Sequence, residues 1–96
     1  SDGRLNDYKK ATGETFSRDD FKNDAALQNK VFKWHIQDID NLIDRLDAEG
    51  YSRDGLRAVA HLGGMTGMRK FVQTRGGYNP EDAFGTSLMD YYNKFK

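Results

Sequence analysis

The chain has 96 residues, with 15 basic and 15 acidic side chains, a net charge of zero and an aromatic content of 12%. This balance disfavours a nucleic-acid-binding module, which normally carries a basic excess on one face. Because the sequence has no cysteine, it excludes disulfides and thiolate metal sites. No apolar run approaches the roughly 20 residues that a membrane span needs. We therefore expect one small domain over residues 1–96, without a membrane span.

The first helices are predicted mainly from their starting signals. Residues 5–11 are typical of a short helix. Ser17 is expected to be the N-cap of a second helix, with Asp20 as its capping-box partner. Phe16 and Phe21 occupy the two positions of a hydrophobic staple. These signals predict that a helix begins after Ser17.

The longest predicted helix covers residues 24–49. Its apolar side chains recur at spacings of four and three, which places them on one stripe: Phe32, Ile36, Ile39, Ile43 and Leu46. Further apolar residues widen this stripe: Leu27, Val31, Trp34 and Leu42. The acids of this helix are expected to lie on a solvated face: Asp38, Asp40, Asp44 and Asp47. Gly50 is expected to end the helix in the left-handed conformation.

Two short apolar helices are predicted next, over residues 52–62 and 66–74. Small residues are concentrated in this part of the chain: Ala58, Ala60, Gly63, Gly64 and Gly67. Small residues let backbones approach closely, so we expect this pair of helices at the centre of the packing. Gly63, Gly64 and Gly67 are accordingly interpreted as structural.

The C-terminal part carries a further helix-start pattern. Asn79 followed by Pro80 matches a cap residue with proline at the first helical position, which predicts a short helical turn. Glu81 and Asp82 would then be first-turn acids that complement the helix dipole. Residues 85–86 are expected to open the last helix. Since no alternating or β-branched run is present, the predicted fold is all-α, a single compact domain of about five helices.

The candidate binding residues have structural interpretations as well. His61 is expected to be a buried, structural histidine, so that His61→Ala would lower stability. One histidine makes neither a metal site nor a catalytic triad, and no metal or cofactor is expected. Trp34 is likewise interpreted as structural. Tyr51, Tyr78 and Tyr91 are possible ligand contacts on a carbohydrate-stacking surface, although core or rim positions are the favoured interpretation.

Two stretches resemble a known family. Residues 55–72, which contain Ala-His-Leu-Gly-Gly at 60–64, resemble a pattern in phage-encoded proteins of the lytic transglycosylase and lysozyme-like superfamily. Residues 78–92 resemble a continuation found in such phage and prophage proteins. The resemblance covers about the C-terminal half of the chain. It implies a partial lysozyme-like helical bundle and a place in a virion or the bacterial cell envelope.

The sequence departs from that family where catalysis is concerned. Its enzymes carry a general-acid glutamate, usually followed by serine, on a helix before this region. Neither Glu14 nor Glu49 has that context, and Glu49 is only a weak catalytic candidate. We therefore expect a non-catalytic helical module of a phage virion or cell-wall-associated protein, which binds peptidoglycan or assembles with structural protein partners. The alternatives are a peptidoglycan-cleaving lysozyme or lytic transglycosylase, and a nucleic-acid-binding helical module.

Overall fold

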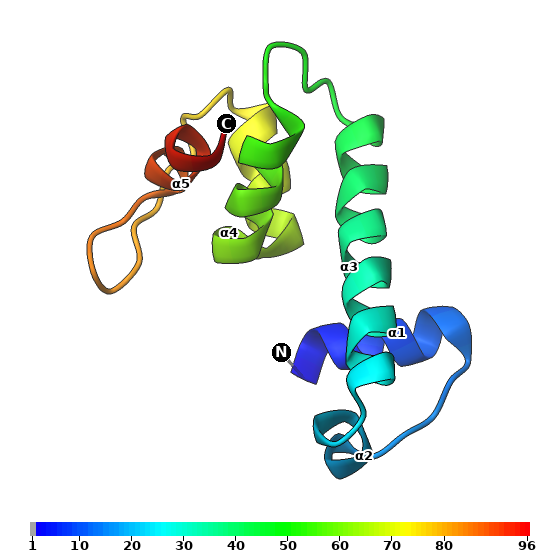
Figure 1. Ribbon diagram of the computed structural model, residues 1–96. Coiled ribbons are helices and arrows are strands. Elements are labelled where there is room, and N and C mark those ends of the chain that lie inside the picture. The colour runs from blue at the N-terminus through cyan, green and yellow to red at the C-terminus, as the bar shows by residue number, and fades with distance from the viewer. Residues whose placement is uncertain (1) are drawn as a thin grey trace. The chain divides into compact units, whose positions relative to one another are not determined.

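A computed structural model describes residues 2–96, which fall into two compact units, one ending at Asp38 and one beginning at Ile39. The described residues form five helices (Figure 1): α1 (Asp2–Thr12), α2 (Arg18–Lys22), α3 (Ala25–Arg45), α4 (Arg53–Gln73) and α5 (Leu88–Phe95). No strand forms within residues 2–96, so the predicted all-α class is confirmed. The lysozyme-like architecture and the single domain stay predictions.

The start of α2 in the N-terminal unit has the geometry that the sequence predicts. The Ser17 hydroxyl accepts a hydrogen bond from the Asp20 amide at 3.0 Å, and the Asp20 carboxylate accepts one from the Ser17 amide at 3.1 Å. The rings of Phe16 and Phe21 are stacked, with centroids 6.1 Å apart. The capping box and the hydrophobic staple are therefore confirmed.

The N-terminal unit packs around Tyr8, whose side chain is buried. Its ring lies edge-on to that of Trp34, with centroids 5.5 Å apart, and 6.1 Å from that of Phe16. The guanidinium of Arg4 lies over Trp34 at 4.7 Å and donates to the Asp38 carboxylate at 2.8 Å. Trp34 is thus held between an aromatic ring and a cation.

Helix α3 is shorter than predicted, since it ends at Arg45 and does not extend to Glu49. The guanidinium of Arg75, distant in sequence, donates to the main-chain carbonyls of Asp47 at 3.2 Å and of Glu49 at 2.6 Å. These long-range bonds stabilise a turn in place of further helix. Gly50 has a left-handed φ of +86°, but it lies in that turn and does not end α3.

The predicted apolar stripe of α3 is only partly buried. Ile39 and Ile43 are buried, whereas Phe32 is 61% exposed. In the N-terminal half of α3, the side chains that face inward are those of Val31, which is buried, and Trp34, which packs against Tyr8. Residues three apart share one side of a helix. Phe32 follows Val31 directly and is therefore turned away from that side.

Helix α4 doubles back at Gly64, whose φ of 76° and ψ of 177° are not helical. A straight helix of 20 residues would be about 30 Å long, yet the ring centroids of Tyr51 and Phe71 lie 5.6 Å apart. Helix α4 is therefore two consecutive helices, and the predicted break between them is confirmed. Ser52 caps the first of them by accepting a hydrogen bond from the Gly55 amide at 3.0 Å.

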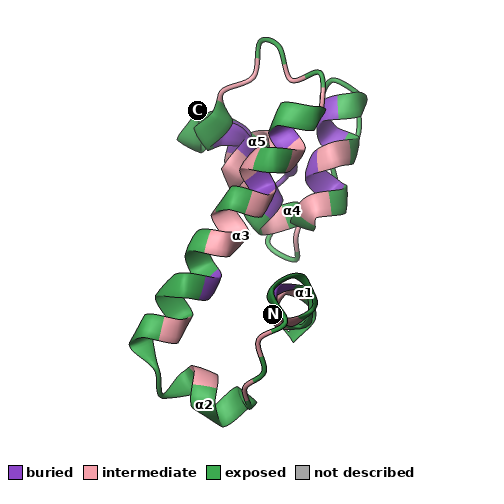
Figure 2. Ribbon diagram, turned by 90° about the vertical axis from the view of Figure 1, so that its right-hand side faces the viewer, coloured by how far each residue is buried: buried purple, intermediate pink, exposed green. Residues whose placement is uncertain are grey.

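Helix α5 packs against α4 and completes the core of the C-terminal unit. The buried apolar side chains of this unit come from α3, α4 and α5 (Figure 2): Ile39, Ile43, Leu56, Val59, Ala60, Met68, Phe71, Val72, Leu88 and Tyr92. A Cβ at Gly55 would lie 2.5 Å from the Tyr92 ring, and one at Gly63 would lie 2.9 Å from Leu88. Gly67 is buried, but a Cβ there would meet no atom within 4 Å. The close approach of α5 to α4 therefore requires glycine at positions 55 and 63, but not at position 67.

The helical turn predicted after Pro80 does not form. Glu81 instead makes an isolated antiparallel bridge with Ser87. Ser87 is the N-cap of α5, in a capping box with Asp90 at 3.1 and 3.0 Å. The Asn79 side chain, predicted to cap a helix of its own, accepts a hydrogen bond at 2.8 Å from an amide in the first turn of α5. Asn79 therefore caps the first turn of α5 and not a helix that follows it directly.

Candidate functional site

An exposed aromatic side chain stands on an ordered loop of the C-terminal unit, residues 79–86, here termed the Phe84 loop. Phe84 is 93% exposed. The Asp82 carboxylate accepts hydrogen bonds from the amides of Phe84 at 2.8 Å and of Thr86 at 3.0 Å. The Asp82 amide donates to the Thr86 carbonyl at 2.8 Å, and Gly85 has a φ of +81°. A hydrogen-bonded turn therefore presents the phenyl ring to solvent.

The surroundings of Phe84 are acidic. Within the loop, Glu81 is exposed, and Asp82 is bonded to loop amides; the loop contains no lysine or arginine. Tyr78, just before the loop, is 37% exposed, and the Lys70 ammonium lies 5.4 Å from its ring centroid. The Phe84 loop therefore combines an apolar tip with a negative flank.

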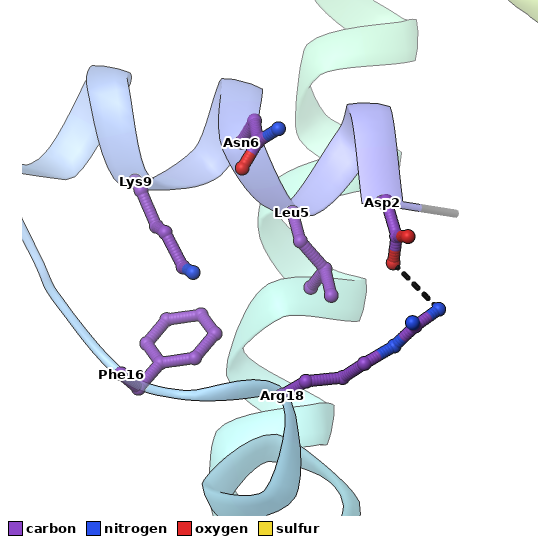
Figure 3. A pocket seen from close by; sticks show the side chains of 6 residues that line it. All are labelled: Asp2, Leu5, Asn6, Lys9, Phe16 and Arg18. Carbon is purple, nitrogen blue, oxygen red and sulfur yellow. Dashed lines mark ion pairs between the residues drawn. The ribbon is translucent and has the colours of Figure 1, made fainter.

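A pocket of about 280 Å³ opens in the N-terminal unit, between α1 and the segment that leads into α2 (Figure 3). It is here termed the α1 pocket, and it is lined by Asp2, Leu5, Asn6, Lys9, Phe16 and Arg18. The Lys9 ammonium lies 4.6 Å from the Phe16 ring centroid, and Arg18 pairs with Asp2 at 2.9 Å. Apolar walls and two cations thus meet in one pocket.

Asp40 is the best-paired carboxylate of the C-terminal unit. Arg57 donates two hydrogen bonds to it, at 2.8 and 2.7 Å, and Arg53 lies 3.6 Å from it. The two arginines also pair with Asp44 and Asp54. The Asp40 side chain is only 17% exposed, so its predicted place on a solvated face was wrong.

These contacts decide what Asp40 can do chemically. The hydrogen bonds from Arg57 are the main cause that holds the pKa of Asp40 below its ordinary value, and burial opposes them. A carboxyl group whose charged form is stabilised in this way is a poor general acid. The cluster is therefore a structural link between α3 and the start of α4.

Glu49, the weak catalytic candidate, is exposed and lies beyond the end of α3. Its main-chain carbonyl accepts a hydrogen bond from Arg75, whose guanidinium also lies 4.7 Å from the Tyr51 ring centroid. A glutamate becomes a general acid at neutral pH in apolar, enclosed surroundings. The exposed position of Glu49 does not favour that role.

His61 is exposed, so the prediction that it is buried was wrong. Its neighbours Val59 and Ala60 take the core-facing positions of α4. Since each helical residue is turned by about 100° from the one before, a residue that follows two buried positions is rotated toward solvent. The structure therefore gives the imidazole of His61 no place in the core.

The three tyrosines predicted as possible ligand contacts lie in different settings. Tyr51 is half-buried and packs edge-on against Tyr92, with centroids 5.2 Å apart. Tyr91 is half-buried and lies edge-on to Phe95 at 6.0 Å. Tyr78 is exposed. Two of the three thus have their rings packed against other aromatic rings.

Sequence reasoning missed Phe84, although a local signal was present. The stretch Asp82-Ala83-Phe84-Gly85 has aspartate at the first and glycine at the fourth position. Both are favoured at these positions in type I turns. Applied here, this turn signal places Phe84 in a turn and not in a helix.

Within residues 2–96, no group of three or more metal-ligating side chains is arranged to hold a metal ion. None of the described helices is long and apolar enough to cross a membrane. No family model, no curated protein and no solved structure matches this chain. The Phe84 loop and the α1 pocket are therefore the features from which a function can be inferred.

Proposed function

We propose that this chain is a non-catalytic helical module that assembles with a protein partner through the Phe84 loop. The observation that supports this proposal is a phenyl ring that is 93% exposed on a hydrogen-bonded turn. Burying such a side chain is worth about 1.5–3 kcal/mol, and aromatic anchors seated in a partner's pocket carry much of the energy of protein interfaces. A loop that is already ordered loses less conformational entropy when it binds.

The resemblance of residues 55–72 and 78–92 to phage lytic transglycosylase-like proteins supplies the setting, a virion or the bacterial cell envelope. The proposed partner is a structural protein of such an assembly, and peptidoglycan is the competing ligand. The Phe84 loop favours the protein, because an exposed phenyl ring gains most from an apolar pocket.

Phe84→Ala tests this proposal. The substitution is expected to weaken binding to a purified virion structural protein by about tenfold or more, since the loss of an anchor typically costs about 2 kcal/mol. Cosedimentation with the virion protein and, separately, with purified peptidoglycan measures the effect. Phe95→Ala is the matched control, because Phe95 is also an exposed aromatic of the same unit, at 51%. It is expected to bind as the wild type does.

Equal binding of the virion protein by the wild type and Phe84→Ala would contradict the proposed surface. Binding to peptidoglycan alone, unaffected by Phe84→Ala, would replace the protein partner by the glycan.

A muralytic enzyme is the rival function, and turbidity clearing of a peptidoglycan suspension tests it. We expect the wild-type chain to leave the turbidity unchanged. Clearing that is lost in Glu49→Gln would assign the general acid to Glu49 and overturn the non-catalytic proposal. Clearing that survives the substitution would also establish an enzyme, with its acid elsewhere.

A further inference from the structure

The α1 pocket has the dimensions of a side-chain receptor. Its volume of about 280 Å³ lies just below the range of about 300–1,000 Å³ that is usual for small-molecule sites. Leu5 and Phe16 provide its apolar walls. Aromatic rings pack well against another ring in offset or edge-on geometry, so a phenyl group is a fitting occupant.

The polar lining of the α1 pocket defines the charge of that occupant. Arg18 is paired with Asp2 at 2.9 Å, so Lys9 supplies the net positive charge of the lining. An occupant that carries a carboxylate beside its aromatic ring would therefore be attracted. The lining of the α1 pocket therefore favours an occupant with an apolar tip and a negative flank.

The Phe84 loop presents this combination. Phe84 is the most exposed of the large hydrophobic side chains of residues 2–96, and Glu81 is an exposed acid three residues before it. The amides of the loop hold the Asp82 carboxylate against the loop through Oδ1, whereas Glu81 is exposed, and we assign the contact with a partner to Glu81. Loop and pocket are complementary in both apolar character and charge.

We propose that the Phe84 loop of one copy of this chain docks into the α1 pocket of a second copy. Phe84 inserts between Leu5 and Phe16, and Glu81 pairs with Lys9. This inference rests on the proposed function, because it makes the second copy the protein partner of the loop. Loop and pocket are different surfaces of the same chain, so two copies can exchange loops in a closed symmetric pair, or further copies can add head to tail.

Light scattering coupled to size-exclusion chromatography tests the docking on the full chain. The weight-average molar mass of the wild type is expected to rise with concentration above the mass of one chain. Phe84→Ala is expected to elute with the mass of one chain at every concentration. Phe95→Ala, the matched exposed aromatic, is expected to associate as the wild type does.

Charge reversal tests the pairing itself. Glu81→Lys and Lys9→Glu are each expected to weaken association about tenfold, and the double variant is expected to recover most of the loss. Failure of the double variant to recover would overturn the assigned pair. The recovery also separates pairing from any damage that Lys9→Glu does to the pocket.

Two outcomes of the mass measurement would overturn the docking. These are a wild type that keeps the mass of one chain at all concentrations, and association that persists in Phe84→Ala. The proposed function is tested separately, because it stands in both cases if a virion protein still binds the wild type and not Phe84→Ala.

Discussion

Asp40 contributes to stability through two hydrogen bonds from one guanidinium, at a position that is more buried than that of Asp44. Arg57 holds it at 2.8 and 2.7 Å, and its side chain is 17% exposed. Asp40→Asn is therefore expected to lower the free energy of unfolding by about 1 kcal/mol at neutral pH. Asp44→Asn is the matched control one turn later, where the side chain is 61% exposed, and it is expected to cost less than about 0.5 kcal/mol. Urea denaturation of both variants measures the difference.

The contribution of Asp40 to the free energy of unfolding is expected to decrease at acidic pH. Because Arg57 lowers the native-state pKa of Asp40, the unfolded chain binds a proton more readily than the folded one does. The stabilisation is complete above the unfolded pKa of about 3.9 and is lost as the pH falls through the lower native pKa. The difference between the wild type and Asp40→Asn should therefore shrink below about pH 4. A difference that grows on acidification would contradict this assignment.

The exposure of His61 reverses the effect expected for its substitution. An exposed side chain away from caps and ion pairs usually changes stability by no more than about 0.5 kcal/mol. His61→Ala is therefore expected to leave the melting temperature almost unchanged in a thermal denaturation followed by circular dichroism. A loss of more than about 5 °C would reinstate the buried, structural histidine.

The reversal of α4 depends on one backbone position. Gly64 has a φ of 76° and a ψ of 177°, a region that costs other residues about 1–3 kcal/mol, and a Cβ there would meet no atom within 4 Å. Gly64→Ala is therefore expected to lower the free energy of unfolding by about 1–3 kcal/mol, through the backbone conformation alone. Gly67→Ala, with equal room for a Cβ, is expected to gain up to about 1 kcal/mol of helix propensity. Urea denaturation that shows the same sign for both variants would refute this distinction.

The sequence predicts where a helix begins or ends when the residues that fix this position are close in the sequence. Ser17 and Ser52 each accept a hydrogen bond from an amide three residues later, so the sequence contains the whole interaction. The end of α3 at Arg45 was not predictable in this way. It depends on Arg75, which binds carbonyls of the following turn from 26 and 28 residues away.

The candidate site was harder to predict than the helices. The helix signal of Asn79 and Pro80 competes with the hydrogen bonds of Asp82, and the latter shape the loop that exposes Phe84. The α1 pocket requires that Phe16 lie beside α1, which the staple of α2 does not reveal. Side-chain competition and tertiary placement therefore limited what the sequence could show.

The two units of the molecule differ in how much apolar surface they bury. Among the described residues, Tyr8 and Val31 are the buried hydrophobic side chains of the N-terminal unit, whereas the C-terminal unit has ten. Segments with few buried apolar contacts open at lower free energy. Helical amides of α1 are therefore expected to exchange with deuterium faster than those of α4, as measured by native-state hydrogen exchange. Equal protection of the two helices would contradict this ranking.

The break at Gly64 also has a consequence for the route by which the C-terminal unit folds. Tyr92 of α5 packs against Tyr51, which is distant in the sequence, but the reversal within α4 makes the two halves of this helix neighbours in the sequence. A chain searches for such neighbours quickly, since little loop entropy is lost before contacts form. We therefore expect the two halves of α4 to pair before α5, which follows after residues 74–87, docks on them.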